Sequence, residues 1–146
     1  MKCVTFTVDQ LLCGIPIDVV RETIDAQPVT PVPLAAAEID GLMNLRGQIV
    51  MAIDLRRRLG LARRDDSCHR MNVVVDVGSG PVSLVVDEVD EVVDLDGPAQ
   101  EPPSTLYHRL RQYVTSVHER DQRTLLVLDA SEVVRIDTIS RLDGAR

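Results

Sequence analysis

The centre of the chain carries the segment Ile39-Asp40-Gly41-Leu42-Met43-Asn44-Leu45-Arg46-Gly47-Gln48-Ile49-Val50. Residues 43–50 predict a strand, a turn and a second strand, because apolar residues flank the polar and glycine pair Arg46-Gly47. Upstream, residues 35–39 are expected to form one helical turn. Gly41 would end that turn, since glycine accepts the left-handed conformation that helix ends often need.

Further strands are expected on both sides of this segment. They are indicated by alternating apolar and polar residues and by runs of β-branched residues, with glycine- and proline-rich turns between them. Only three of the 146 residues are aromatic, so valine, leucine and isoleucine must build the core, and valine favours strands. The expected strands are residues 4–8, 11–17, 51–55, 72–77, 82–87, 89–95, 113–118 and 124–128.

Short helices are expected between these strands. Asp18 is placed to cap a helical turn over residues 19–22. Residues 104–111 have room for one or two turns, and residues 131–146 are expected to hold a final helix. The predicted fold class is therefore all-β, or mainly β, with short connecting helices.

The two halves of the sequence share a pattern. A strand, turn and strand, followed by an acidic segment with valine, occupies residues 4–25 and includes Val20-Arg21-Glu22. The pattern recurs over residues 72–94 with Val89-Asp90-Glu91, at an offset of about 68 residues. A chance match is the alternative in a chain so rich in valine. A true repeat would mean two similar β-lobes, interleaved in a single domain over residues 1–146, instead of one sandwich.

The charge and the sequence ends bound the protein class. A net charge of −7 and a pI near 4.9 argue against nucleic-acid binding, which needs clustered positive charge. There is no leader pattern and no apolar run of roughly 18 residues that would span a membrane, and the three cysteines show no paired spacing. We therefore expect a cytosolic protein. One basic run is interpreted as a solvated loop, and it consists of Arg56, Arg57, Arg58, Arg63 and Arg64.

Nucleotide chemistry is not indicated by the sequence. Lys2 is the only lysine, whereas a P-loop, a protein kinase and Schiff-base chemistry each need one in a defined place. The dinucleotide fingerprint Gly-x-Gly-x-x-Gly does not occur. Asp54 at a strand end would suit a phospho-acceptor, but a receiver-like site would also need a lysine. The residues therefore predict a protein that is not an enzyme and uses no cofactor.

Metal and thiol chemistry have little support either. The three histidines do not have the spacings of zinc ligands, so no metal site is expected. The acidic residues from Asp87 to Asp96 lack the pattern of a calcium loop, and we interpret them as the solvated face of a valine-bearing strand. A hydrolase that uses Cys68 or Cys13 as its nucleophile remains an alternative, because its partner residues can be distant in sequence.

Five ordered motifs, covering roughly residues 3–135, resemble those of the CheW-like domain family. The central one has the family's Gly-x-x-Asn-Leu-Arg-Gly core at residues 41–47, followed by an apolar strand that ends in Asp54-Leu55-Arg56. The sequence Asn-Leu-Arg-Gly alone would be a weak sign, whereas five motifs in family-like order are a specific one. The others are Cys13-Gly14-Ile15-Pro16-Ile17 with Val20-Arg21-Glu22, Pro31-Val32-Pro33, residues 84–92, and Tyr113-Val114-Thr115 with residues 125–129.

The resemblance implies two small five-stranded β-barrel lobes around a shared apolar interface. It also implies a non-enzymatic chemotaxis adaptor that binds the regulatory domain of a CheA-type histidine kinase and the cytoplasmic signalling tips of chemoreceptors. Such an adaptor is recruited to membrane receptor arrays without entering the membrane, and it binds no nucleic acid. A CheW-like adaptor of another receptor–kinase pathway, for surface motility or gene regulation, is the alternative. No kinase catalytic domain fits beside this domain in 146 residues.

The resemblance also implies a partner-binding site. Arg46 and Glu22 are expected to pair on a face turned towards the kinase or the receptor. Val20 and Val92 are expected to flank the lobe junction as a groove for a helical receptor tip, with Gly41 allowing close approach. The plainer alternatives are an Arg46–Glu22 bridge that only holds the turn, and valines that belong to the core.

Three residues differ from the family pattern. Ser83 and Ser116 stand where glycine is usual, and Cys13 replaces a customary aromatic residue. These differences concern local contacts and leave the expected fold unchanged.

Overall fold

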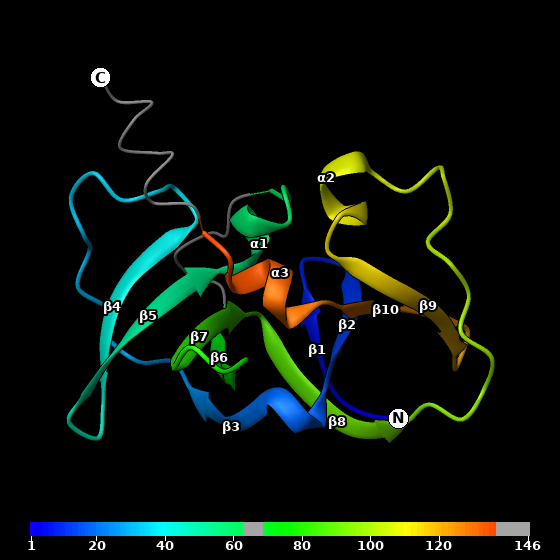
Figure 1. Ribbon diagram of the computed structural model, residues 1–146, viewed down its shortest axis with the longest axis horizontal. Coiled ribbons are helices and arrows are strands. Elements are labelled where there is room, and N and C mark those ends of the chain that lie inside the picture. Colours follow the sequence, from blue (N-terminus) through cyan, green and yellow to red (C-terminus); the bar gives the residue numbers. More distant parts are fainter. Residues whose placement is uncertain (63–68, 137–146) are drawn as a thin grey trace.

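The computed structural model describes residues 1–62 and 69–136 and consists mainly of strands in two five-stranded sheets, lobe 1 and lobe 2 (Figure 1). Lobe 1 contains β1 (Lys2–Val8), β2 (Leu11–Pro16), β8 (Glu88–Asp94), β9 (Val114–Arg120) and β10 (Arg123–Leu128), in the order β8-β1-β2-β10-β9. Lobe 2 contains β3 (Val20–Asp25), β4 (Ile39–Leu45), β5 (Gln48–Asp54), β6 (Met71–Asp76) and β7 (Pro81–Val86), in the order β3-β6-β7-β5-β4.

The predicted mainly β fold with two five-stranded lobes is confirmed. In the described part of the chain, backbone pairing leaves β8 and β9 as the edges of lobe 1, and β3 and β4 as the edges of lobe 2. Neither sheet is therefore closed into a complete barrel by its hydrogen bonds.

Short helices follow several of the strands. They are η1 (Ile17–Val19), α1 (Leu55–Arg58), α2 (His108–Arg111) and α3 (Ala130–Val134). Asp54 Oδ1 accepts a hydrogen bond of 3.1 Å from Arg56 N at the start of α1, and Asp129 Oδ1 accepts one of 3.0 Å from Ser131 N at the start of α3. These carboxylates satisfy amides that lack partners within the helix.

Each lobe is built from both halves of the chain. The strands β1 and β2 join β8, β9 and β10, whereas β3, β4 and β5 join β6 and β7. Val4 pairs with Ile15 in one hairpin and Val73 with Leu84 in the other, so the two hairpins correspond at a shift of 69 residues. The parallel pairs correspond as well, because β10 lies beside β2 as β5 lies beside β7. The internal repeat is therefore real, and its halves exchange three strands each.

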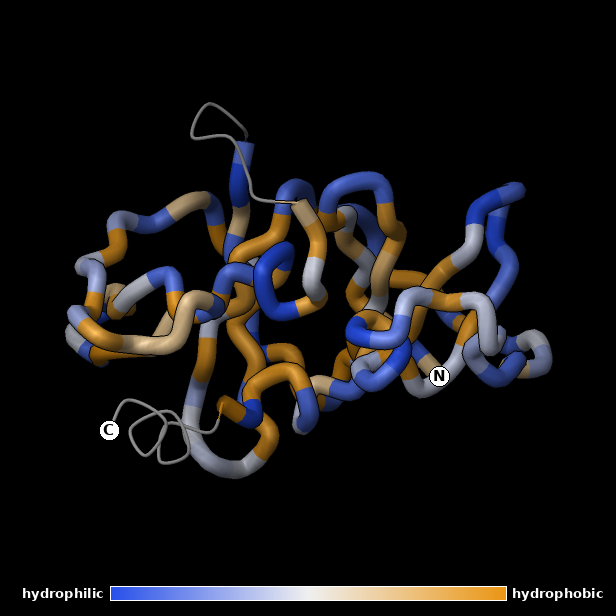
Figure 2. The backbone as a smooth tube through the Cα atoms, turned by 90° about the horizontal axis from the view of Figure 1, so that it is seen from above, coloured by the Kyte–Doolittle hydropathy of each residue, from blue (hydrophilic) through white to orange (hydrophobic). Residues whose placement is uncertain are grey.

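Three apolar clusters of buried side chains fill the described part of this architecture. Figure 2 shows hydrophobic residues recurring along the backbone of both lobes. The largest takes side chains from both sheets and forms the shared apolar interface that was expected. A smaller cluster lies within each lobe. Since burial of one large aliphatic side chain stabilises a fold by about 1.5–3 kcal/mol, the shared cluster holds the lobes together. Its fully buried members include Phe6, Ile15, Ile53, Leu84 and Leu128.

The helical turn expected at residues 19–22 is wrong. Asp18 lies inside η1, and β3 begins at Val20. Burial alternates along β3, and the strand pairs with β6 in lobe 2. Pairing across the sheet therefore overrides the local capping signal of Asp18.

Residues 35–39, which were expected to form a helical turn, contain one hydrogen-bonded turn and no helix, because the amide of Ile39 donates to the carbonyl of Ala36 at 3.0 Å. The carbonyl of Glu38 accepts a hydrogen bond of 2.8 Å from the amide of Asp54, so the β4–β5 hairpin already begins there. Gly41 lies within β4 and ends no helix. The expected final helix is present as α3 alone, while residues 137–146, like Cys68, Arg63 and Arg64, lie outside the described residues.

The interior of lobe 2 accommodates Ser83 in place of the usual glycine. Ser83 Oγ donates a hydrogen bond of 2.9 Å to Asn72 Oδ1, and both residues are fully buried. In lobe 1 the equivalent positions are Cys3 and Gly14, which carry no such pair of hydrogen-bonding side chains. A buried hydroxyl is costly unless it is hydrogen-bonded, so Ser83 and Asn72 form a matched pair.

We expect Asn72→Cys to lower the free energy of unfolding by about 1–3 kcal/mol, because the Ser83 hydroxyl is left without its partner. The double variant Asn72→Cys with Ser83→Gly copies lobe 1 and should recover the part of that loss that Ser83 causes, whereas the hydrogen bond of 3.2 Å from Asn72 Nδ2 to the carbonyl of Asp25 stays lost. Urea denaturation of both variants measures the difference. Equal losses in the single and double variants would contradict the coupling of the pair.

Candidate functional site

The turn between β4 and β5 places Arg46 at the tip of lobe 2. The φ angles of Arg46 and Gly47 are 51° and 88°, and two successive positive φ angles suit the twist of a two-residue hairpin turn. Asn44 Oδ1 accepts a hydrogen bond of 2.8 Å from Gly47 N. A residue other than glycine is uncommon in this region of φ, so Arg46 occupies an unfavourable backbone conformation.

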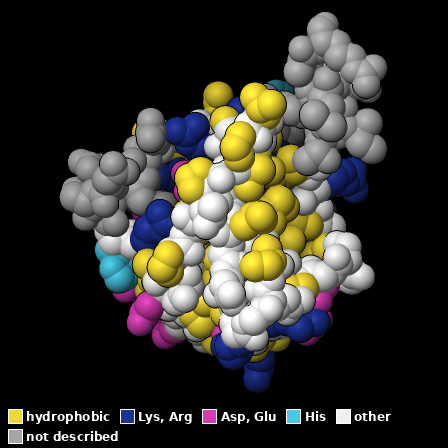
Figure 3. All heavy atoms as spheres, turned by 90° about the vertical axis from the view of Figure 1, so that its left-hand side faces the viewer, with side chains coloured by type: hydrophobic (Ala, Val, Ile, Leu, Met, Phe, Trp, Pro, Cys, Tyr) yellow, Lys and Arg dark blue, Asp and Glu magenta, His cyan; other side chains and the backbone are white. Residues whose placement is uncertain are grey.

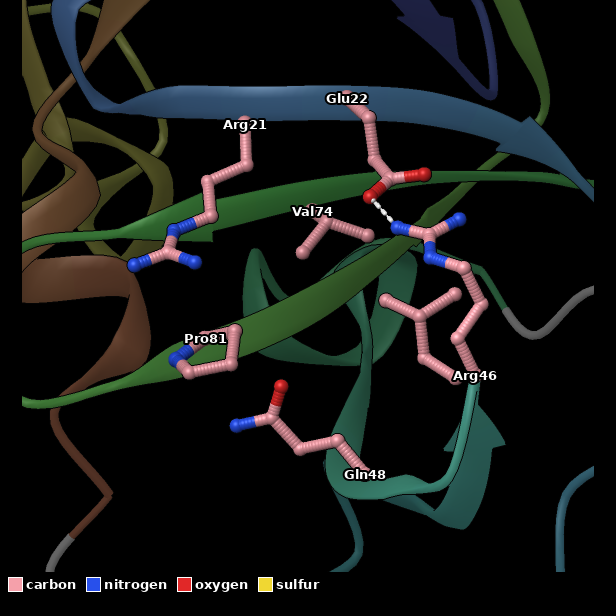
Figure 4. A pocket seen from close by; sticks show the side chains of 7 residues that line it. Arg21, Glu22, Arg46, Gln48, Val74 and Pro81 are labelled. Atoms are coloured by element: carbon pink, nitrogen blue, oxygen red, sulfur yellow. Dashed lines mark hydrogen bonds and ion pairs between the residues drawn. The ribbon is translucent and has the colours of Figure 1, made fainter.

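Arg46 forms an ion pair with Glu22 of β3 (Figure 4). Its Nη2 donates a hydrogen bond to Glu22 Oε2. This bond, helped by the attraction between the charges, lowers the pKa of Glu22 and raises the pKa of Arg46 relative to their ordinary values. The side chains are 69% and 27% exposed. An ion pair this exposed adds little to stability, so its main structural effect is to orient the guanidinium.

The oriented guanidinium keeps donors for a second acceptor. Arginine has five N–H donors in a planar fork, and Glu22 uses only part of that fork. Beside it, Arg21 is 58% exposed and pairs with Asp76 at 2.7 Å. Two guanidinium groups thus frame a depression of about 200 Å³, which suits a carboxylate carried by a partner. Its other lining residues are Leu45, Gln48, Val74 and Pro81.

The Arg46–Glu22 pair also bridges the two open edges of lobe 2. Glu22 lies on β3, and Arg46 directly follows β4. Lobe 1 has a corresponding contact between its edge strands, where Arg120 Nη2 lies 3.7 Å from Glu91 Oε1. Glu91 is the equivalent of Glu22 at the shift of 69 residues. In both lobes an ion pair therefore spans the gap that backbone hydrogen bonds leave open.

Val20 and Val92 lie on the edge strands of different lobes. Val20 on β3 is half-buried and packs against the shared apolar cluster. Val92 on β8 is 52% exposed, next to acidic neighbours on the same strand. The structure therefore gives Val20 a core position and leaves Val92 open to a partner.

Gly41 is needed within the chain itself. A Cβ atom at this position would lie 2.5 Å from the carbonyl oxygen of Thr30, and the φ angle of Gly41 is 154°. Thr30 pairs with Leu42 through two backbone hydrogen bonds of 2.8 and 2.9 Å. The sequence suggested that Gly41 lets a partner protein approach closely. In the structure, the close neighbour of Gly41 is the segment of this chain that precedes β4.

An apolar face on the β4–β5 hairpin was missed by sequence reasoning. Leu42 and Ile49 are 39% and 63% exposed on the outer side of the hairpin, while Met43 and Val50 point inward. Figure 3 shows hydrophobic side chains gathered along this side of the molecule. Contiguous exposed apolar surface of this kind marks protein-binding sites. Apolar residues on both faces of one hairpin were the signal in the sequence.

The described thiols do not support a hydrolase. Cys13 is fully buried, and burial raises the pKa of its thiol to about 12, so the reactive thiolate does not form at neutral pH. Burial also raises the pKa of Cys3. Cys68 lies outside the described residues.

Other chemistry in the described ranges is limited. Ser116 Oγ and His118 Nε2 are 3.2 Å apart, which gives the serine that replaces a glycine a polar neighbour. Residues 1–62 and 69–136 contain no group of three histidine, cysteine or acidic side chains arranged to hold a metal ion. Within the same ranges, no helix has the length and apolar character needed to cross a membrane.

The fold and its exposed side chains define a two-lobed β-domain with an exposed ion pair and an exposed apolar face on lobe 2. The model of the CheW-like domain matches residues 2–138, and the chain therefore belongs to the CheW-like domain family. This membership makes it a scaffold, or adaptor, of chemotaxis signal transduction.

Individual relatives agree with the family. The chemotaxis protein CheW of Treponema pallidum is 27% identical over 97% of this chain and 86% of its own length. A probable chemotaxis protein CheW of Rhizobium etli is 30% identical over 83% of this chain and 78% of its own length. The crystal structure of the scaffolding protein TtCheW from Thermoanaerobacter tengcongensis superposes with a TM-score of 0.82, at 27% identity and 93% coverage of both chains.

We expect Gly41→Ala to lower the free energy of unfolding by about 2 kcal/mol or more, because the new methyl group meets backbone atoms that cannot move cheaply. Gly97→Ala is the matched control, since a Cβ atom there has no neighbour within 4 Å. Thermal and urea unfolding compare the two. If Gly41→Ala is as stable as the control, the requirement for glycine lies at a partner contact instead.

Proposed function

We propose that this chain couples methyl-accepting chemoreceptors to a CheA-type histidine kinase and catalyses no reaction itself. It acts in the cytoplasm and is recruited to receptor arrays, where it binds the regulatory domain of the kinase and the cytoplasmic tip of the receptor. A scaffold of this kind works by raising the effective concentration of its partners and by coupling their conformations. Membership of the CheW-like family supports the proposal.

The observation that carries the proposal is the ion pair at the tip of lobe 2. Arg46 is held by Glu22, remains 69% exposed, and sits at a positive φ that an arginine does not favour. The same backbone geometry recurs at Asp121 and Gln122 in lobe 1, so the exposed and oriented guanidinium supports the assignment, and the backbone conformation does not. We assign Arg46 and Glu22 to partner contact, with Gly41 maintaining the strand beside them.

Two further surfaces supply the two faces that an adaptor needs. The exposed apolar residues Leu42 and Ile49 on lobe 2 suit the kinase regulatory domain, because apolar patches with polar rims are typical of stable protein interfaces. Val92 on β8, supported by the half-buried Val20 on the neighbouring lobe, suits a helical receptor tip. Ile49 and Val92, the most exposed residue of each surface, lie on different lobes, so both partners can bind at once.

We expect Arg46→Ala to leave the domain folded and to abolish activation of the kinase in a reconstituted receptor array. Arg46→Gly should have the same effect. Because glycine adopts a positive φ readily, this variant separates the loss of the guanidinium from any change in backbone strain. Arg135→Ala is the control, since Arg135 is a similarly exposed, ion-paired arginine that does not line the depression beside Arg46. Kinase autophosphorylation in the array is the measurement. Full activation by Arg46→Ala would refute the site.

Charge reversal separates the two roles of the pair. If Arg46 contacts the partner, the double variant Arg46→Glu with Glu22→Arg should stay inactive although the ion pair can form again. Restored activation would show that the bridge is the essential part and would rule out direct contact by Arg46.

We expect Val92→Met to weaken binding of the receptor tip by about tenfold, or 1.4 kcal/mol, while the melting temperature stays close to that of the wild type. Ile49→Ser is the reciprocal variant, which should weaken binding of the kinase regulatory domain and leave the receptor tip unaffected. Calorimetric titration with each partner tests both variants. A loss of stability that matches the loss of binding would place Val92 in the core.

A further inference from the structure

The end of α3 is held by an arginine from the other lobe. Arg58, the last residue of α1, follows the lobe 2 strand β5, whereas α3 follows the lobe 1 strand β10. Arg58 Nε donates to the carbonyl of Val133 at 2.9 Å, and its Nη2 donates to the carbonyls of Glu132, at 3.0 Å, and Arg135. Carbonyls at a helix end lack partners within the helix, so Arg58 acts as their cap.

The end of α1 is held in the opposite direction. Arg109 of α2, which precedes β9 of lobe 1, donates to the carbonyls of Arg57 at 3.1 Å and Arg58 at 3.3 Å. Gly60 makes room for the stem of this arginine, because a Cβ atom there would lie 2.7 Å from Arg109 Cδ. Each lobe therefore caps a helix that belongs to the other, at the place where α1, α2 and α3 gather above the junction (Figure 1).

Two further side chains join these arginines. Glu38, from the connection between β3 and β4, lies 3.9 Å from Arg58 Nη1 and 3.7 Å from Arg109 Nη2. The ring of Tyr113 lies beneath the Arg58 guanidinium, 5.0 Å from centroid to Cζ. Arg58 is only 12% exposed, so its contacts are largely shielded from solvent. We call Arg58, Arg109 and Glu38 the helix clasp.

The helix clasp adds directional hydrogen bonds to a junction whose core is apolar. Packing within the shared cluster resists separation of the lobes, but apolar contacts are non-directional and tolerate small sliding movements. A planar guanidinium bound to three carbonyl acceptors tolerates much less sliding, because a hydrogen bond weakens steeply as its donor–hydrogen–acceptor angle departs from linear. A buried arginine is also a poor choice for filling space alone, since desolvation of its charge is costly.

We propose that the helix clasp fixes the angle between the two lobes and thereby transmits the binding of one partner to the surface that binds the other. The coupling part of this inference rests on the proposed function, whereas the effect on the lobe angle does not. Arg58 and Arg109 are positioning residues, because neither lies in the partner surfaces assigned above.

The lobe angle is tested in the free protein. Spin labels are placed at Gln48→Cys and Arg123→Cys, which are exposed, equivalent positions in the two lobes, in a Cys68→Ser background that leaves only the buried Cys3 and Cys13. The distance distribution between the labels should shift or broaden in Arg58→Met and in Arg109→Met. Arg111→Met, an exposed arginine of the same helix α2, is the control and should change nothing. An unchanged distribution in both clasp variants overturns the inference.

Coupling is tested with both partners. The affinity for the kinase regulatory domain is measured with and without a saturating receptor tip, and the wild type should show a ratio of about fivefold or more. Arg58→Met and Arg109→Met should bring this ratio close to one while each single affinity stays within about twofold of the wild type. A wild-type ratio of one, or an unchanged ratio in the variants, overturns the transmission role. Failure of the wild type to bind either partner would instead refute the proposed function and leave the distance measurement to decide the clasp.

Discussion

The carboxylate of Asp87 holds the point at which the chain passes from lobe 2 to lobe 1, since this single residue separates β7 from β8. Arg56 donates to both of its oxygens, at 3.0 and 2.6 Å, and the amide of Asp9 donates to one of them at 2.7 Å. A bidentate pair fixes orientation as well as distance. Removing two charges from water offsets much of the energy that a buried ion pair gains. The Arg56–Asp87 pair therefore contributes mainly by fixing one specific arrangement of the chain. It joins α1, the crossing and the β1–β2 turn in one arrangement. The exchange of strands between the lobes depends on that crossing.

Strand exchange makes the two lobes dependent on each other. Each sheet takes two strands from one half of the chain and three from the other, so neither half can complete a sheet alone. The shared apolar cluster then forms between sheets that the backbone already links at two crossings. This construction suits an adaptor, because a shared core holds surfaces on different lobes in a defined relation to each other. The helix clasp lies at the same junction, between the helices that follow the strands of each lobe.

Local features of the fold were predictable from the sequence, and distant pairings were not. Residues 43–50 gave the β4–β5 hairpin with Arg46 at its turn, since turn residues between apolar strands act locally. The capping signal of Asp18 predicts a helical turn over residues 19–22 that does not form, because the pairing of β3 with β6 decides the conformation at Val20. Asp54 was considered as a phospho-acceptor, and its role is to cap α1. The resemblance to the family supplied the Arg46–Glu22 pair. The exposed face with Ile49 was missed, because whether an apolar residue is covered depends on segments far away in the sequence.

The internal repeat shows how one backbone plan provides two different surfaces. The β9–β10 turn occupies the same place in lobe 1 as the β4–β5 turn in lobe 2, and it has the same pair of positive φ angles, 49° at Asp121 and 64° at Gln122. Arg46 thus has Asp121 as its equivalent, with Arg120 and Arg123 on either side of that aspartate, so matching backbones carry different charge patterns at the two tips. Interior positions are constrained by packing, whereas a turn tip is free to change its charge. Because charge patterns steer association, a partner that recognises the pattern at one tip meets a different pattern at the other.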